Sequence, residues 1–116
     1  MTRDFEVVRN LLLQIEAAPS GQPIHSLEFE GDDAVLAEYL EILIEAGLLD
    51  GKVIGSEPVA FAIRRLTWEG HDFIEKARND TTWNKVMGQA KKHGGAVTLA
   101  ILKGLLTKAA ESAAGL

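Results

Sequence analysis

The stretch LEILIEAGLL, residues 40–49, decides the fold. Its first part continues a pattern that starts at residue 33, in which apolar side chains recur every three or four positions, as they do on one face of a helix. Gly47 follows that pattern and is the residue type that most readily adopts the left-handed conformation just past a helix end. Leu48 then opens an apolar run typical of a strand. The stretch therefore predicts a helix over residues 33–46 that leads directly into a strand.

Upstream, the sequence predicts a helix over residues 4–17 and a short strand over residues 24–29. The apolar side chains of the helix share one face: Phe5, Val8, Leu12 and Ile15. Prolines and glycine in residues 18–23 end it. Leu27 and Phe29 alternate with glutamates, as in a half-exposed strand. Asp32 is placed to cap the helix over residues 33–46, whose predicted buried stripe is Leu36, Tyr39, Leu40, Leu43 and Ile44.

Downstream, two strands over residues 48–54 and 59–66 are joined by the turn residues Gly55, Ser56, Glu57 and Pro58, which predicts a β-hairpin. Thr67 is placed to cap a helix over residues 68–78. A further helix starts at Asp80 or Thr81 and stops at Gly94 and Gly95, and a last helix is expected over residues 96–112.

Trp68 and Trp83 each lie near the start of a predicted helix. Both are interpreted as core residues, with Trp68 anchoring the start of its helix, because tryptophan suits sites that bury a large apolar body. The alternative is a surface hot spot for a partner.

The order of helix, short strand, helix, two-stranded wing and further helices is the skeleton of a winged-helix domain. We therefore expect an α+β fold with a winged-helix-like core over residues 1–79. Residues 80–116 would form a C-terminal helical extension that packs on the core or on a second copy.

Four segments carry a more specific resemblance: Arg3-Asp4, residues 45–48, residues 66–73 (LTWEGHDF) and residues 77–85 (ARNDTTWNK). With them the sequence resembles an uncharacterised family of small bacterial and prophage proteins, the domain-of-unknown-function family twenty-five-thirteen. The resemblance runs through most of the chain. It implies a winged-helix-like fold and a phage or mobile-element setting, and it supplies no established activity and no functional residues.

Three carboxylates share one face of the helix over residues 33–46: Glu38, Glu41 and Glu45. This helix contains no Lys or Arg, although it stands where a winged-helix protein reads DNA. Carboxylates set against phosphates repel them. Three interpretations stay open: a solvated face, a face that docks a basic partner, and direct reading of a DNA groove. Only a single turn near residues 31–35, or no helix at all, is left for the usual support helix.

Charge divides unevenly along the chain. Residues 1–50 hold two basic and eleven acidic residues, a net −9, and residues 51–116 hold ten basic and six acidic, a net +4, within a total of −5. A strongly acidic half argues against a protein built mainly for nucleic acid. If DNA or phosphate is bound, the candidate contacts are Arg64, Arg65, Lys76, Arg78, Lys85, Lys91 and Lys92.

The last predicted helix is apolar on more than one side, which favours burial on two sides. One side can pack on its own domain. The other can pack on a second copy, so a homodimer is the expected partner arrangement if it is not buried within the chain. The candidate dimer contacts are Ile101, Leu102, Leu105 and Leu106.

The composition argues against several classes of function. The absence of cysteine excludes a disulfide scaffold, a thiol nucleophile and a Cys-based zinc site. The three histidines form no zinc-binding pattern, and neither a nucleophile elbow nor a phosphate loop is present. No signal peptide or membrane-spanning run is visible, which favours a cytoplasmic protein. We expect no cofactor, no metal and no catalysis.

Two functional hypotheses follow. The first is a non-catalytic winged-helix binding module of phage or mobile-element type, with DNA-associated regulation suggested by analogy of fold alone. The alternative is a protein-interaction adaptor that docks a basic partner on Glu38, Glu41 and Glu45.

Overall fold

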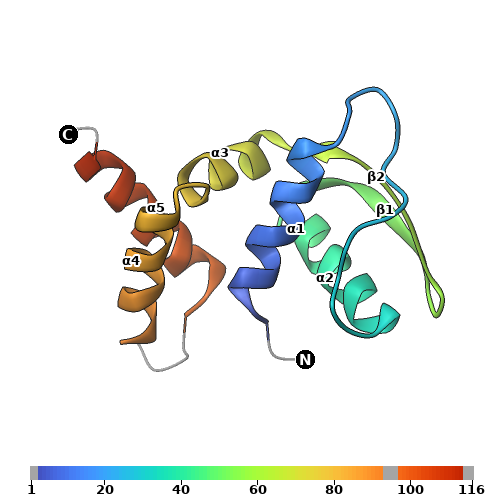
Figure 1. The fold of residues 1–116 in the computed structure, drawn as a ribbon, viewed down its shortest axis with the longest axis horizontal. Helices are drawn as coiled ribbons and strands as arrows, with labels where there is room; N and C mark the ends of the chain where they lie inside the picture. Colours follow the sequence, from blue (N-terminus) through green and yellow to red (C-terminus); the bar gives the residue numbers. More distant parts are fainter. Residues whose placement is uncertain (1–2, 93–96, 114–116) are drawn as a thin grey trace. The chain divides into compact units, whose positions relative to one another are not determined.

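The computed structural model describes residues 3–92 and 97–113 and shows a mixed α+β fold (Figure 1). Its described elements are α1 (Phe5–Ala17), α2 (Asp33–Glu45), β1 (Leu49–Ser56), β2 (Val59–Leu66), α3 (Trp68–Ala77), α4 (Asp80–Lys91) and α5 (Leu99–Ala113). The chain forms two compact units, Met1–His71 and Asp72–Leu116, each described by itself below. The division lies inside α3, whereas the sequence indicated a boundary after residue 79.

The first unit begins with α1, whose predicted apolar face is buried at three of its four residues, whereas the fourth, Phe5, is half-buried. The side chain of Asp4 caps the helix by accepting a hydrogen bond from the backbone N–H of Glu6 at 2.9 Å. The residues that α1 buries are Val8, Leu11, Leu12 and Ile15. The hydroxyl of Tyr39 accepts a hydrogen bond from the Asp4 N–H at 2.9 Å, which ties the start of α1 to α2.

The passage from α2 to β1 confirms the prediction made from residues 40–49. Gly47 has a φ of +78°, the left-handed conformation expected just past a helix end. The N–H of Leu48 then donates to the carbonyl of Leu43 at 3.0 Å, which closes the helix before β1 begins. Asp32 stands at the N-cap position of α2, and its side chain forms no capping hydrogen bond there.

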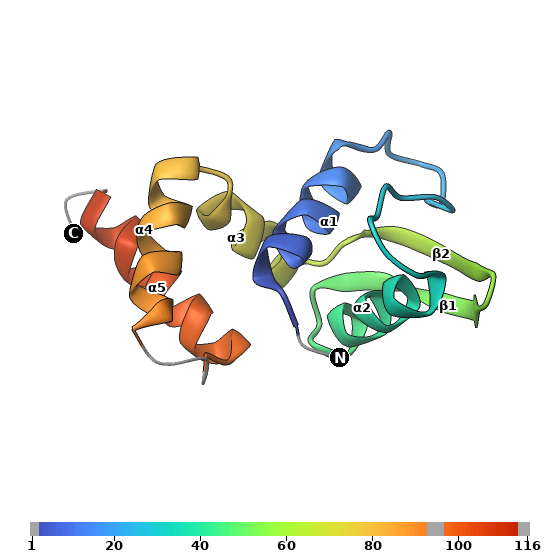
Figure 2. The ribbon, with the colours of Figure 1, turned by 60° about the horizontal axis from the view of Figure 1, so that its bottom comes forward.

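The predicted hairpin is confirmed, with a longer first strand. β1 and β2 pair antiparallel from Leu49 opposite Leu66 to Ser56 opposite Val59, so that only Glu57 and Pro58 form the turn. Figure 2 shows α2 lying along this hairpin. Two residues of β2 in the hairpin, Phe61 and Ile63, are buried, with exposed fractions of 3% and 0%.

The predicted strand over residues 24–29 is wrong except at one residue. Ile24 forms an isolated antiparallel bridge with Ile63, through N–H···O bonds of 2.8 and 3.0 Å. Beyond it, side chains take the place of a strand partner. His25 Nδ1 donates to the Phe61 carbonyl at 3.0 Å. The side-chain amide of Gln14 bonds both the N–H and the carbonyl of Glu28, at 2.8 and 2.9 Å.

The second unit packs its helices around Trp83, which is fully buried and contacts Phe73 edge to face at a centroid distance of 6.5 Å. Asn79 caps α4 by accepting from the Thr82 N–H at 2.9 Å. The other buried side chains of this unit are Phe73, Ile74, Ala77, Val86, Ala90, Leu102 and Leu106. The predicted helix stop at Gly94 and Gly95 lies outside the described residues.

The prediction that Trp68 is a core residue is wrong. Its side chain is 82% exposed, whereas Trp83 is 0% exposed. Trp68 is the first residue of α3, and the inward face of that helix passes instead through Phe73, Ile74 and Ala77.

Candidate functional site

The outer face of α2 carries a ridge of three exposed carboxylates, Glu38, Glu41 and Glu45, which we call the acidic ridge. Their spacing of three and four residues aligns them along one side of the helix. No described residue forms a hydrogen bond or ion pair with these carboxylates. The ridge is therefore available to a partner.

The acidic ridge is unfavourable to α2 itself. Like charges at these spacings destabilise a helix by about 0.2–0.5 kcal/mol per pair. Glu45 also lies in the last turn, where the helix dipole favours cations and where α2 has none. No hydrogen bond or ion pair from the described residues offsets this repulsion.

The β1–β2 hairpin has no basic residue at its tip, where the turn consists of Glu57 and Pro58. Its two arginines lie at the opposite end, at a β-bulge that places Arg64 and Arg65 opposite Asp50. The Asp50 carboxylate lies 3.2 Å from Arg64 and 3.7 Å from Arg65. The bulge explains why two consecutive residues of a strand are both exposed, and Asp50 offsets part of their charge.

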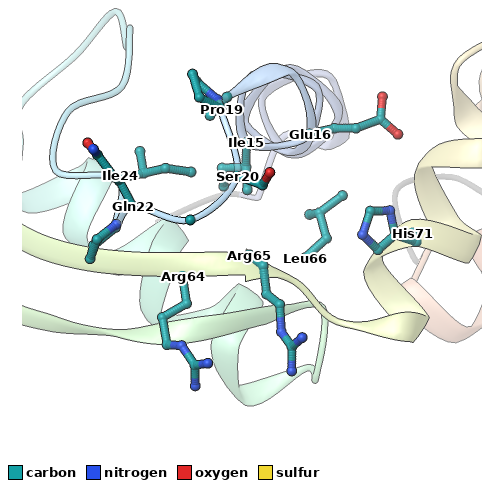
Figure 3. A pocket seen from close by; sticks show the side chains of 13 residues that line it. Ile15, Glu16, Pro19, Ser20, Gln22, Ile24, Arg64, Arg65, Leu66 and His71 are labelled. Atoms are coloured by element: carbon teal, nitrogen blue, oxygen red, sulfur yellow. The ribbon is translucent and has the colours of Figure 1, made fainter.

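A cavity of about 550 Å³ lies in the first unit between the end of α1, residues 18–24, β2 and His71 (Figure 3). The side chains of Ile15 and Leu66 line its inner wall, and the guanidinium groups of Arg64 and Arg65 point to the other side of β2. The arginines therefore contribute backbone and not charge to this cavity. Ser20 and His71 also line the cavity, and no hydrogen bond joins their side chains.

The remaining predicted contacts lie in the second unit. Lys76 Nζ donates to the Thr107 hydroxyl at 3.1 Å, and Arg78 forms an ion pair with Glu75 at 3.5 Å. The exposed cations of α4 and its C-cap are Lys85, Lys91 and Lys92. They belong to a different unit from Arg64 and Arg65.

The four predicted dimer residues on α5 separate into two pairs. Leu102 and Leu106 are fully buried, so they serve the core of their own unit. Ile101 is 39% exposed and Leu105 is half-buried, so these two retain surface for a partner.

Sequence reasoning missed the exposure of Trp68, although the signal was present. The inward positions of α3 recur at residues 70, 73, 74 and 77. Trp68 is five and six residues before Phe73 and Ile74, which places it on a different side of the helix. The spacing of Trp68 from the buried residues of α3 therefore predicts its exposure, whereas its residue type does not.

These features define an α+β protein with an exposed acidic helix face. Within residues 3–92 and 97–113, no three His, Asp or Glu side chains are grouped so that they could hold a metal ion. In the same part of the chain, no helix has the length and apolar character needed to cross a membrane.

The chain belongs to the family described as "Hypothetical protein (DUF2513)", which matches residues 2–96. It is also similar to an "Uncharacterized protein" of Haemophilus influenzae, at 32% identity over 89 residues that cover 74% of this chain and 75% of that protein. No solved structure matches the chain. The family match includes the acidic ridge, the β1–β2 hairpin and α4, and it ends before α5.

Proposed function

We propose that this chain is a non-catalytic protein-interaction module of winged-helix type that docks a basic partner on the acidic ridge. The observation that carries the proposal is the exposure of Glu38, Glu41 and Glu45 without a described partner. Such a surface attracts a complementary basic one and orients it during encounter.

The order of elements supports the winged-helix interpretation. α1, the Ile24 bridge, α2 and the β1–β2 hairpin follow each other as the core elements of that fold do. Residues 18–32, all of which the structure describes, contain no helix, so the usual support helix is missing. In this interpretation α2 corresponds to the reading helix.

The charge of α2 favours a protein partner over DNA. A reading helix lies within the Debye length of about 8 Å from the phosphates, where carboxylates are repelled. The wing tip, with Glu57, does not supply the cations that would compensate.

Synthetic nona-lysine is a suitable probe for this proposal, with affinity measured by calorimetry at 50 and 300 mM salt. The triple variant Glu38→Lys, Glu41→Lys, Glu45→Lys should bind at least about tenfold more weakly, because attraction at the ridge becomes repulsion. The matched control reverses Glu28, Glu30 and Glu57, which are exposed elsewhere in the same unit and change the net charge equally. Equal losses in the two triple variants would show that total charge, and not the ridge, binds the peptide.

DNA-associated regulation in a phage or mobile-element setting is the second candidate. It is favoured by the exposed cations at the β-bulge, Arg64 and Arg65, and by Lys85, Lys91 and Lys92 in the second unit. It predicts a mobility shift on mixed duplex DNA at 50 mM salt that weakens steeply as salt rises. The absence of a shift at low salt would reject it.

A homodimer through α5 is a further part of this proposal, supported by the exposed surface of Ile101 and Leu105. Sedimentation of the wild type should show a dimer, and Ile101→Lys should yield a monomer because it places charge in an apolar contact. A wild type that sediments as a monomer at 100 µM would reject the dimer.

A further inference from the structure

Trp68 is the largest exposed apolar side chain that the structure describes, at 82% exposure, compared with 65% for Ile54 and 39% for Ile101. We propose that Trp68 is the aromatic anchor at one end of the acidic ridge and stacks on arginine side chains of the basic partner. This inference rests on the proposed function and specifies the chemistry of its partner.

The start of α3 is fastened to the end of α2. The N–H of Thr67 donates to the Leu48 carbonyl at 3.1 Å, and its hydroxyl donates to the carbonyl of Gly47. Gly70 lies so close to Leu48 that an added Cβ would collide with the Leu48 carbonyl oxygen. Since Gly47 comes two residues after Glu45, these contacts place the backbone of Trp68 next to the C-terminal end of the ridge.

The indole of Trp68 is held on a rigid element and left open. Trp68 is the first residue of α3, directly after the Thr67 cap, whose hydroxyl accepts from the Gly70 N–H at 3.1 Å. No aromatic contact to this ring is formed by the described residues, whereas Trp83 contacts Phe73. A tryptophan on a fixed backbone loses little conformational entropy on binding, which is why this residue type is enriched in binding hot spots.

The charge of the unit that contains Trp68 favours a cationic group as its partner. Glu69 is exposed and follows Trp68 in sequence, and Glu45 is exposed two residues before Gly47, whose carbonyl accepts from the Thr67 hydroxyl. The nearest cations in sequence, Arg64 and Arg65, pair with Asp50. The first unit as a whole has five basic and thirteen acidic residues, a net −8.

Arginine suits this combination better than lysine. Its planar guanidinium stacks on an aromatic face and at the same time donates paired hydrogen bonds to a carboxylate. A lysine ammonium is a strongly hydrated point charge that responds to the carboxylates and gains less from the ring. The surface therefore fits an arginine-bearing segment of a partner protein.

The test compares nona-arginine with nona-lysine, which carry the same charge, by calorimetry on the full chain. Wild type should bind nona-arginine about fivefold to tenfold more tightly than nona-lysine. Trp68→Ala should remove most of this preference by weakening only the arginine peptide, and Trp68→Phe should give an intermediate preference because a smaller ring remains. Ile54→Ala, which removes another exposed apolar side chain of the same unit, should bind as the wild type does. Far-ultraviolet circular dichroism checks that each variant is folded.

The outcomes separate this inference from the proposed function. If Trp68→Ala keeps the wild-type preference for arginine while reversal of the acidic ridge abolishes binding, the anchor is wrong and the proposed function stands. Equal weakening of both peptides by Trp68→Ala would also overturn the stacking role. If the wild type binds neither peptide at 50 mM salt, the proposed function and the anchor are both rejected.

Discussion

The starts of α3 and α4 look alike in sequence and differ in structure. Each follows a polar cap, Thr67 or Asn79, that accepts a hydrogen bond from an N–H three residues later. Each carries a tryptophan in its first turn or just after it. Trp83 is fully buried in the second unit, whereas Trp68 of the first unit is 82% exposed.

The difference teaches that position within the turn outweighs residue type. Trp83 is the fourth residue of α4 and lies on the same side as Val86 and Ala90, which are also buried. In α3 the inward position of the first turn is the third residue, Gly70, where the Leu48 carbonyl leaves no space for a side chain. Trp68 is two residues before Gly70 and therefore lies on the outward side of α3.

The largest expected effect is the loss of Trp83. Trp83→Ala should lower the free energy of unfolding by about 3–5 kcal/mol, because it removes a fully buried aromatic side chain and leaves a cavity. Trp68→Ala should change it by less than about 0.5 kcal/mol, as surface substitutions usually do. Urea unfolding, monitored by circular dichroism, measures both free energies. Similar losses in the two variants would show that the two tryptophans do not differ in burial.

The next effect concerns the fit of α3 against Leu48. Gly70→Ala should cost about 2–3 kcal/mol, because the new Cβ would collide with backbone that cannot rotate away. The matched control is Gly88→Ala in α4, where an added Cβ meets nothing within 4 Å. A Gly70→Ala variant as stable as the wild type in thermal unfolding would contradict the close approach on which the placement of Trp68 depends.

The two caps should differ by a smaller amount. Thr67→Ala should cost about 2 kcal/mol and Asn79→Ala about 1 kcal/mol, since the Thr67 hydroxyl also donates to the Gly47 carbonyl. Denaturant midpoints of the two single variants give the comparison. A larger loss in Asn79→Ala would mean that the link from Thr67 to Gly47 adds no stability.

The smallest expected effect is a gain. Gly88→Ala should raise the free energy of unfolding by about 0.5–1 kcal/mol, because Gly88 is exposed within α4 and alanine is the better helix former. Thermal unfolding measures the gain. A loss of stability would show that the exposed side of α4 is more crowded than the described residues indicate.

The signals that predicted the fold correctly are local ones. The periodicity of α1 and α2, the glycine at position 47 and the Thr67 cap all depend on residues within a few positions of each other. The acidic ridge was predicted for the same reason, since Glu38, Glu41 and Glu45 fall opposite the apolar stripe. Helix spacing fixes exposure once the buried side is known.

The errors arise where a distant group decides the outcome. The predicted strand over residues 24–29 is reduced to one bridge, because His25 and the amide of Gln14 satisfy backbone groups that a strand would have used. The sequence offered Leu102 and Leu106 as dimer contacts, but both side chains are fully buried within the chain. Neither result follows from spacing alone.

The sequence by itself determined the α+β order of elements, the end of α2 at Gly47 and the sign of the charge on its outer face, because these depend on helix periodicity and local caps. Only the tertiary structure decided which tryptophan is buried, that both arginines of the bulge lie near Asp50, and that the backbone before Trp68 is bonded to the residues that follow α2. The physical reason is that burial and proximity depend on which groups from distant parts of the chain occupy the space around a residue. At Gly70, that group is a single carbonyl oxygen of Leu48.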